Sequence, residues 1–234
     1  MFIKKWEELP ESLRNDAVRP YYDTLVRKQG ALVLKRLFDI VVSACMLIVL
    51  APVFLLLAVA IKLDSPGPVF YRQVRITRYG KEFRIFKFRS MVTDADQKGS
   101  LVTVSGDSRI TRVGRLIRKC RLDELPQLLN VLTGDMTFVG TRPEVAKYVA
   151  RYTPEMLATL LLPAGITSEA SIRYKDEDKL LKDADDVDKV YIEAVLPGKM
   201  QYNLASVREF TFFGDIATML RTVLAVLGKD YGEA

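Results

Sequence analysis

The stretch that decides the fold is IVVSACMLIVLAPVFLLLAVAI, residues 40–61, which runs for 22 residues without a charged side chain. As a straight α-helix it would extend roughly 33 Å, at about 1.5 Å per residue, and so could reach across the hydrocarbon core of a bilayer. An unbroken apolar run of this length is rare inside a soluble domain of this size. The sequence therefore predicts that this segment associates with a membrane.

The apolar run contains Pro52 near its middle, directly after Ala51. Proline removes one backbone hydrogen bond and clashes with the preceding turn, so we expect a kink at this pair. Positive residues mark the cytoplasmic side of a membrane segment, and here both flanks are positive. This favours a helix that enters the bilayer, bends and returns; a kinked helix that crosses the bilayer is the alternative. The flanking basic residues are Arg27, Lys28, Lys35 and Arg36 before the run, and Lys62, Arg72, Arg75, Arg78 and Lys81 after it.

The charge of this 234-residue chain is unevenly distributed. Residues 1–122 hold 23 Lys and Arg against 11 Asp and Glu, whereas residues 123–234 hold 12 against 18. The charge of the first half therefore predicts an anionic partner, with a phosphate ligand, an acidic lipid and a nucleic acid as the alternatives. The chain has no histidine, which excludes Ser-His-Asp and Cys-His triads and zinc sites built on imidazole. An enzyme made from this chain must use Asp, Glu, Lys, Cys and hydroxyl groups.

Two basic segments follow the apolar run. VFYRQVRI (69–76) and FRIFKFRSM (83–91) alternate apolar with polar residues and are separated by Tyr79-Gly80, a pattern that predicts a β-hairpin. In this alternation Lys87 and Arg89 share one face, which is either a solvated strand edge or a surface that contacts phosphates or lipid headgroups.

The segment SRITRVGRLIRKCR (108–121) has apolar residues at helical spacing with arginines between them. It predicts an amphipathic basic helix suited to anionic headgroups, and a helix that binds nucleic acid has the same periodicity.

The next stretch, RLDELPQLLN (121–130), places Asp123 and Glu124 just before Pro126. Proline belongs in the first turn of a helix, so both acids should lie at the positive end of a helix dipole, close to Arg118. Both influences favour the ionised form of the two carboxylates. A helix cap combined with a surface ion pair is the alternative interpretation of an isolated Asp-Glu pair.

Three later segments complete the pattern. GTRP (140–143) predicts a tight loop that presents Arg142, whose guanidinium fork can bind a phosphate through two hydrogen bonds. Residues 175–190 are strongly charged and predict a solvated helix without a chemical role. FFGDIATMLRTVLAVLG (212–228) is amphipathic, and we expect it to pack on the core, with the membrane surface as the alternative.

Taken together, four segments resemble the bacterial sugar transferase family. They are KRLFDIVVSACMLIVLAPVF (35–54), GPVFYRQVRITRYGKEFRIFKFRSM (67–91), RKCRLDELPQLLNVLTGDMTFVGTRPE (118–144) and GIT (165–167), and the resemblance runs from about residue 35 to the C-terminus. Members of this family are monotopic phosphoglycosyl transferases. The resemblance implies an α+β fold, with a membrane-embedded re-entrant helix kinked at proline and a small catalytic domain of mostly amphipathic helices and a short β-hairpin or sheet.

The resemblance also implies roles for individual residues. Asp123 looks like the nucleophile that takes up the phosphosugar, and Glu124 looks like a ligand of magnesium, with manganese as the alternative ion. Ala51-Pro52 matches the Ser-Pro at the kink of the family's re-entrant helix. The resemblance also places Arg118 and Arg142 near the substrate phosphates, and we expect Lys87 and Arg89, on the face of the hairpin described above, to bind these phosphates as well.

Three positions depart from the family pattern. Thr141 replaces the first proline of the Pro-Arg-Pro motif, Ala51 lacks the serine hydroxyl at the kink, and Pro163-Ala164-Gly165 stands where Arg-Pro-Gly is common. None of these changes touches the Asp-Glu pair.

The implied reaction moves a sugar 1-phosphate from a UDP-sugar to polyprenyl (undecaprenyl) phosphate through an aspartyl-phosphosugar, releases UMP, and starts the assembly of a bacterial glycoconjugate. The implied location is the inner membrane, with the catalytic domain on its cytoplasmic face and anionic lipids as partners. Nucleic acid is not an expected partner. The alternatives are a non-enzymatic, membrane-tethered basic scaffold or nucleic-acid-binding protein, and a glycosyltransferase that moves the sugar alone.

We expect three parts in the chain. Residues 1–34 form an N-terminal extension, expected to be an interfacial helix, with a homodimer contact as the alternative role. Residues 35–62 form the re-entrant helix, and residues 63–234 form the catalytic domain.

Overall fold

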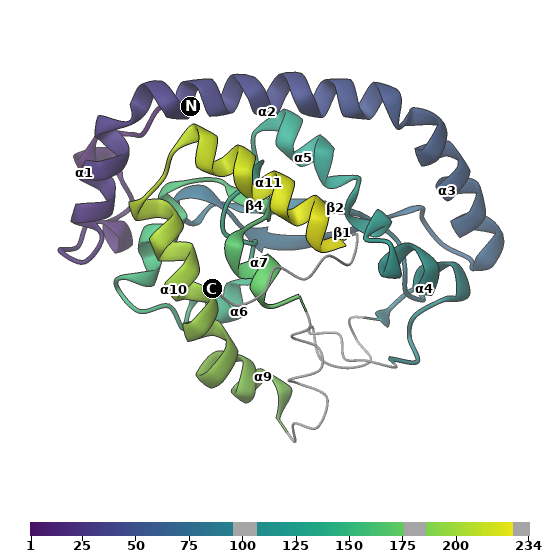
Figure 1. The fold of residues 1–234 in the computed structure, drawn as a ribbon. Coiled ribbons are helices and arrows are strands. Elements are labelled where there is room, and N and C mark those ends of the chain that lie inside the picture. Colours follow the sequence, from purple (N-terminus) through teal and green to yellow (C-terminus); the bar gives the residue numbers. More distant parts are fainter. Residues whose placement is uncertain (96–106, 176–185, 227–234) are drawn as a thin grey trace.

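The computed structural model describes residues 1–95, 107–175 and 186–226. They form an α+β fold with one long helix along the top of the molecule and two small sheets below it (Figure 1). The predicted α+β class and the β-hairpin are confirmed, and the re-entrant placement of the helix in a membrane stays a prediction. The described helices are α1 (Arg19–Arg27), α2 (Gln29–Val49), α3 (Ala51–Asp64), α4 (Arg112–Lys119), α5 (Gln127–Thr133), α6 (Ala146–Val149), α7 (Glu169–Arg173), α9 (Val187–Val190), α10 (Leu196–Arg208) and α11 (Phe212–Val226). The strands are β1 (Phe70–Ile76), β2 (Glu82–Phe88), β3 (Met136–Val139) and β4 (Ala164–Thr167).

Helices α2 and α3 form a bent pair that meets at 61°, with Leu50 at the break. Ala51 and Pro52 begin α3, so the bend lies where the sequence predicts the kink. Pro52 has no N–H to donate to the carbonyl of Ile48, four residues earlier, and its ring crowds that turn. In the part of the chain that the structure describes, no single helix is long and apolar enough to cross a bilayer, and α2 with α3 meets that criterion only as a bent pair.

The outer faces of α2 and α3 are apolar and exposed. Side chains of this kind normally pack into a core, and a surface that displays them along two successive helices marks an interaction site. The exposed residues are Leu34, Leu37, Ile40, Val41, Ile48 and Val49 on α2, and Leu55, Leu56, Val59 and Leu63 on α3.

The inner side of α2 is tied to the domain by three polar side chains. Lys35 donates a hydrogen bond to the carbonyl of Val139 at 2.8 Å. Arg36 donates to two carbonyls at the C-terminal end of α5, at 2.6 and 2.8 Å. Asp39 accepts a hydrogen bond from the Thr137 hydroxyl at 2.8 Å. Charged side chains inside an apolar helix are therefore satisfied by the backbone and side chains of the sheet region, which orients α2 with its apolar face outwards.

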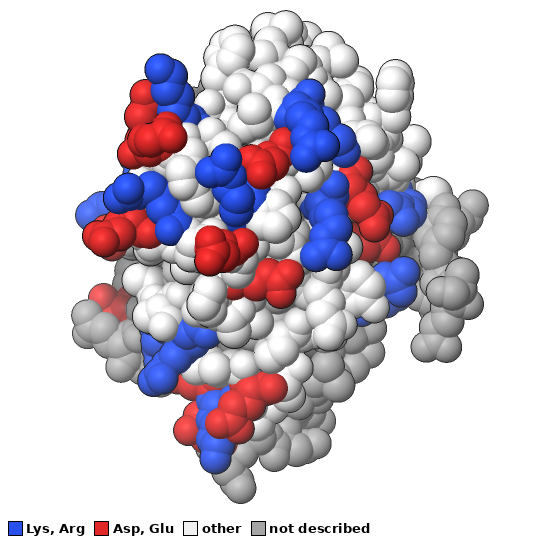
Figure 2. All heavy atoms as spheres, turned by 90° about the vertical axis from the view of Figure 1, so that its left-hand side faces the viewer, with Lys and Arg blue, Asp and Glu red and all other residues white. Residues whose placement is uncertain are grey.

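Residues 1–27, predicted as part of an interfacial extension, pack into the domain. Leu13, Val18 and Leu25 are fully buried, in a cluster with side chains of the 3-10 turn Met156–Leu161. These apolar side chains therefore face the core of the domain, while Phe2 and Val26 of the same segment are exposed, and the interfacial role of the segment stays a prediction. The outer side of this segment carries basic and acidic side chains close together (Figure 2). The homodimer contact stays a prediction.

The hairpin of β1 and β2 is antiparallel and places Tyr71 opposite Lys87. Tyr79 and Gly80, with φ of 60° and 76°, form its turn, as the sequence predicts. Tyr71, Gln73 and Arg75 alternate along β1 and so share one face of the hairpin with Lys87.

A second sheet pairs β3 and β4 in parallel. Its strands have only four residues each and are almost wholly buried, so they show no alternation that a sequence pattern could detect. A Cβ on Gly165 would lie 2.2 Å from the nitrogen of Gly140, so the chain after β3 can pass β4 this closely only because glycine is there. The Gly140 N–H also donates to the Thr167 carbonyl at 3.0 Å. These contacts fix the start of the loop that carries Arg142.

Helix α11 lies beneath α2 (Figure 1) and packs on the core through only part of its apolar surface. Phe212 stacks edge-on against Phe38 of α2, and Met219 joins the cluster around β3 and β4. Phe213 and Leu220 of the same helix are exposed. Most of the predicted charged helix at residues 175–190 lies outside the described residues; α9 is the described part.

Replacement of Leu25 by alanine tests whether residues 1–27 belong to the core. Leu25 has no exposed surface, so Leu25→Ala should destabilise the protein by roughly 2–5 kcal/mol and lower its thermal midpoint in detergent by roughly 5 °C or more. The neighbouring Val26 is 37% exposed, and Val26→Ala should change the stability by less than about 0.5 kcal/mol. Equal, small effects of both changes would contradict this packing.

Candidate active site

Asp123 and Glu124 lie in a 3-10 turn (Leu122–Glu124) between α4 and α5. Arg121 precedes this turn with φ of 55°, a left-handed conformation that is uncommon for a residue with a side chain and often marks a functional site. Helix α5 begins only at Gln127. The two acids therefore form a turn of their own just ahead of α5, at the N-terminal end of that helix, where the sequence predicts them.

Glu124 is held by two cations from distant parts of the chain. Lys87 of β2 donates to its Oε1 at 2.9 Å, and Arg142 of the loop after β3 donates to the same oxygen at 2.5 Å. A longer contact of 3.5 Å joins Arg142 to Oε2. Burial alone would raise the pKa of Glu124, but Arg142 and Lys87 outweigh it and hold that pKa well below the ordinary value. Glu124 is therefore ionised, as predicted, although the cations responsible are not the ones expected.

Asp123 has the opposite electrostatic character. Only 7% of the residue is exposed, and burial raises its pKa above the ordinary value, with a further increase from the Glu124 carboxylate. The positive charges of Lys87, Arg118 and Arg142 act in the other direction. The influence of Arg118 is thus in the predicted direction, but burial and the neighbouring carboxylate outweigh it, so the pKa of Asp123 is raised overall. None of the described residues donates a hydrogen bond to this carboxylate, so its oxygens can accept a ligand.

Arg118 lies close enough to Asp123 to affect its pKa. Its guanidinium finds no hydrogen-bond acceptor within residues 1–95, 107–175 and 186–226. This leaves Arg118 available to an anionic ligand beside the Asp-Glu pair, as the resemblance implies.

Arg89 is not part of this cluster. It is 5% exposed, and its guanidinium donates to the carbonyls of Ser65 and Pro66 at 2.6 and 2.7 Å, just beyond the end of α3. Strand β2 ends at Phe88, so the alternation that placed Arg89 on the face of Lys87 does not extend to it. The structure is inconsistent with the expected phosphate contact and makes Arg89 an anchor for the end of α3.

Arg75 is a site residue that sequence reasoning did not select. It lies on the face of the hairpin that carries Lys87, and burial lowers its pKa although Glu144 opposes this effect. Its Nη1 lies 3.9 Å from Glu144 and donates to the Pro143 carbonyl at 3.2 Å. The alternation of Tyr71, Gln73 and Arg75 along β1 was the signal that could have found it.

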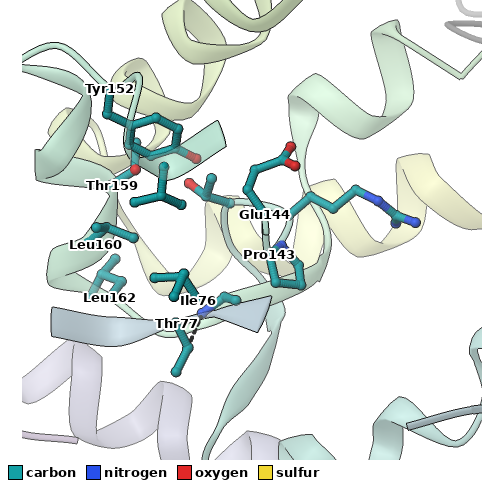
Figure 3. A pocket seen from close by; sticks show the side chains of 12 residues that line it. Ile76, Thr77, Pro143, Glu144, Tyr152, Thr159, Leu160 and Leu162 are labelled. Atoms are coloured by element: carbon teal, nitrogen blue, oxygen red, sulfur yellow. Dashed lines mark hydrogen bonds between the residues drawn. The ribbon is translucent and has the colours of Figure 1, made fainter. Parts of the chain in front are cut away.

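A small hollow lies behind the loop that carries Arg142 (Figure 3). Pro143 and Glu144 border it on one side, with Leu160 and Leu162 on the other. Neither Asp123 nor Glu124 lines it. The hollow thus does not include the Asp-Glu pair, although Arg142 is among the residues that line it.

The carboxylates fit a magnesium ion only in a limited way. The described residues include no group of three or more His, Cys, Asp and Glu side chains that could hold a metal. Magnesium is commonly bound by one or two carboxylates together with substrate phosphates and water. Asp123 has oxygens to offer. Oε1 of Glu124 already accepts from Lys87 and Arg142 at short distance, whereas Oε2 has only the 3.5 Å contact with Arg142. The site thus suits an ion that shares the oxygens of a phosphate ligand.

Comparison of the sequence with known proteins identifies its family. The sequence model described as bacterial sugar transferase matches residues 30–229. The chain belongs to the bacterial sugar transferase family. The match begins within α2, so the buried segment of residues 1–27 lies outside it.

Three relatives illustrate the similarity. The chain is 34% identical over 197 residues to the UDP-N-acetylgalactosamine-undecaprenyl-phosphate N-acetylgalactosaminephosphotransferase of Aeromonas hydrophila, which covers 83% of this chain and 44% of the relative. It is 34% identical to the UDP-glucose:undecaprenyl-phosphate glucose-1-phosphate transferase of Escherichia coli, covering 91% and 44%. It is 36% identical to the protein of the same name from Caulobacter vibrioides, covering 84% and 70%. The chain thus spans less than half the length of the first two relatives.

Removal of Lys87 tests the electrostatics of the pair. Lys87→Met takes away a positive charge that favours the ionised form of Asp123, so the pKa of Asp123 should rise further above its ordinary value. The measurement is a pH titration of the Asp carboxyl carbons by ¹³C NMR in metal-free, detergent-solubilised protein, with Asp123→Asn to assign the signal. Arg84→Met on the same strand removes an exposed cation and should leave this pKa unchanged. An unchanged or lowered pKa in Lys87→Met contradicts the arrangement.

Proposed function

We propose that the chain transfers a sugar 1-phosphate from a UDP-sugar to undecaprenyl phosphate and releases UMP. The observation that carries this proposal is the surroundings of Asp123: a carboxylate without a hydrogen-bond donor among the described residues, next to Lys87, Arg118 and Arg142. Two of the three relatives above are named as glucose-1-phosphate transferases that use UDP-glucose and undecaprenyl phosphate. Such a donor carries a pyrophosphate, whose negative charge would repel an anionic nucleophile unless cations surround it.

The first half of the proposed reaction uses Asp123 as the nucleophile. One carboxylate oxygen attacks the phosphorus that bears the sugar, a new O–P bond forms, and the bond from that phosphorus to the bridging oxygen breaks as UMP leaves with the electron pair. An ionised carboxylate has no proton to lose, so this step needs no general base and is compatible with a chain that lacks histidine. In the second half, a phosphate oxygen of the polyprenyl carrier attacks the same phosphorus and displaces the Asp123 carboxylate.

The cations have separate tasks in this scheme. Arg118 faces the phosphates from α4, and Lys87 and Arg142 approach from the side of Glu124. Glu124 keeps these two cations oriented before and during the transfer. A magnesium ion, held by Asp123 and Glu124 together with phosphate oxygens, would supply further neutralisation of the charge on the pyrophosphate.

We also propose that α2 and α3 enter one leaflet of the bacterial inner membrane from the cytoplasmic side and return. Their exposed apolar faces support this placement, because such faces are stable against lipid tails. Helix α4 lies against α3 and exposes Leu116 between Arg112, Arg115 and Lys119, a pattern suited to anionic headgroups. In this arrangement a water-soluble donor and a lipid acceptor reach the catalytic pair from opposite sides.

The function is tested by incubating the purified protein with undecaprenyl phosphate, Mg²⁺ and a panel of UDP-sugars, with the released nucleotide identified by chromatography. Release of UMP is expected, whereas release of UDP would indicate transfer of the sugar alone. Asp123→Asn should lower the rate of UMP release by roughly a thousandfold or more, because it removes the nucleophile. Asp135→Asn, which changes an acid at the other end of α5, should retain activity. Full UMP release by Asp123→Asn would show that Asp123 is not the nucleophile, whereas no nucleotide release by the wild-type protein with any UDP-sugar would support a non-enzymatic scaffold.

Re-entry is tested by labelling single cysteines at the two ends of the bent pair. Cys45 and Cys120 are first replaced by serine, and Leu34→Cys and Leu63→Cys are made separately at exposed positions. A membrane-impermeant maleimide should label neither cysteine in intact spheroplasts and both after permeabilisation. Labelling of one of them in intact spheroplasts means that the pair crosses the bilayer.

A further inference from the structure

A second cluster of buried polar side chains lies behind Arg142. Glu144, two residues further along the loop, is 7% exposed and accepts a hydrogen bond from the Tyr191 hydroxyl. Lys199 is 4% exposed; it donates to the same hydroxyl at 3.1 Å and lies 4.0 Å from Oε1 of Glu144. Arg75 lies 3.9 Å from the other carboxylate oxygen. No sequence pattern indicates a role for Glu144, Tyr191 or Lys199.

This cluster and the neighbouring strand β1 hold the loop through contacts with its side chains and hydrogen bonds to its backbone. Arg75 donates to the Pro143 carbonyl at 3.2 Å, and the N–H of Ile76 donates to the Glu144 carbonyl at 2.9 Å. Figure 3 shows Pro143 and Glu144 next to each other on the side of the loop that faces Ile76. The residue immediately before Pro143 is Arg142, whose side chain reaches the Asp-Glu pair. The orientation of this guanidinium therefore depends on a loop that the cluster holds from behind.

The local helix geometry brings Tyr191 and Lys199 together. They are eight residues apart, and two turns of α-helix take only about 7.2 residues, so in a regular helix they would drift apart around the axis. A π-helical turn at Tyr191–Val195 accommodates the additional residue. The Lys199 ammonium then lies 5.2 Å from the centre of the Tyr191 ring. Such turns lower the regularity of a helix and frequently mark functional positions.

Removal of a single member of this cluster should be energetically costly. A buried ammonium is tolerated only with partners, and here the Glu144 carboxylate lies within 4.0 Å of both Lys199 and Arg75. Loss of the Tyr191 hydroxyl would leave the Glu144 carboxylate and the Lys199 ammonium without their shared hydrogen-bond partner. The carboxylate would then shift towards its cations, and the loop that carries Arg142 would shift with it.

We propose that Glu144, Tyr191 and Lys199 are positioning residues that hold Arg142 towards the substrate phosphates. This inference rests on the proposed function, and it assigns to α10 and the π-helical turn a direct influence on the phosphate chemistry. The three residues do not touch the reacting atoms; they act through the loop and its guanidinium. Their effect falls on the first half of the reaction, in which the donor pyrophosphate is cleaved.

Two adjacent tyrosines provide a matched pair of variants. The rings of Tyr148 and Tyr191 lie 4.8 Å apart, but the Tyr148 hydroxyl bonds to Asp188 and not to Glu144. Tyr191→Phe should lower kcat/KM for UMP release roughly tenfold or more through kcat, with the KM for the polyprenyl acceptor unchanged. Tyr148→Phe removes the same group at the same depth and should change kcat/KM less than about twofold. Lys199→Met should resemble Tyr191→Phe, and Lys199→Arg, which keeps the charge, should recover most of the activity.

A double-mutant cycle with Arg142→Lys distinguishes positioning from general stability. If Tyr191 acts through Arg142, Tyr191→Phe should cost little further activity once Arg142 has been replaced, so the two effects should not add. Full additivity, or equal losses in Tyr148→Phe and Tyr191→Phe, would overturn the inference, as would losses that follow the thermal midpoints of the variants. A wild-type protein that releases no UMP from any UDP-sugar would defeat the proposed function, and this inference with it. Release of UMP with additive losses would defeat this inference alone.

Discussion

The candidate site depends on one shared acceptor, the carboxylate of Glu124. Lys87 from the hairpin and Arg142 from the loop after β3 both donate to its Oε1, so three segments far apart in the sequence meet at one oxygen. In a partly dehydrated site a charge without a partner is expensive, and removal of Glu124 would leave two cations facing each other. This single arrangement therefore orients the hairpin, the Asp-Glu turn and the loop relative to one another. Without Glu124 the two cations would repel each other, so the relative placement of these three segments depends strongly on this carboxylate.

The same arrangement separates the properties of two adjacent acids. Glu124 has cations in hydrogen-bond contact and a pKa far below the ordinary value, whereas Asp123 is buried beside that negative charge and has a raised pKa. One acid is thus fixed as a permanent anion that holds cations, and the other keeps its oxygens available. In a chain without histidine, the proposed covalent transfer of a phosphosugar would depend on this division of labour between neighbouring carboxylates.

The position of the site relative to a membrane follows from the two sides of α2. Lys35, Arg36 and Asp39 bond to the sheet region and to the end of α5, while the opposite side exposes leucine, isoleucine and valine. The polar contacts fix the rotation of α2 about its axis, because a rotated helix would leave charged groups without partners. The domain below α2 therefore has a defined orientation to whatever covers the apolar face. Figure 1 shows α5 and α11 directly beneath α2, and β3 also contacts it.

The sequence by itself determined the features that rest on local chemistry. Proline sets the bend at Ala51-Pro52, alternation and a Tyr-Gly turn set the hairpin, and the motif from Arg118 to Glu144 indicates the family and the Asp-Glu pair. Only the tertiary structure decided which groups meet. In the tertiary structure, apolar side chains of residues 1–27 pack against the core, and two short strands without a sequence pattern of their own form a parallel pair. Arg89 binds carbonyls at the end of α3, and Arg75, Tyr191 and Lys199 lie close to Glu144. The physical reason is that propensity and periodicity act over a few neighbouring residues, whereas the partner of a buried charge is chosen by the packing of the whole chain.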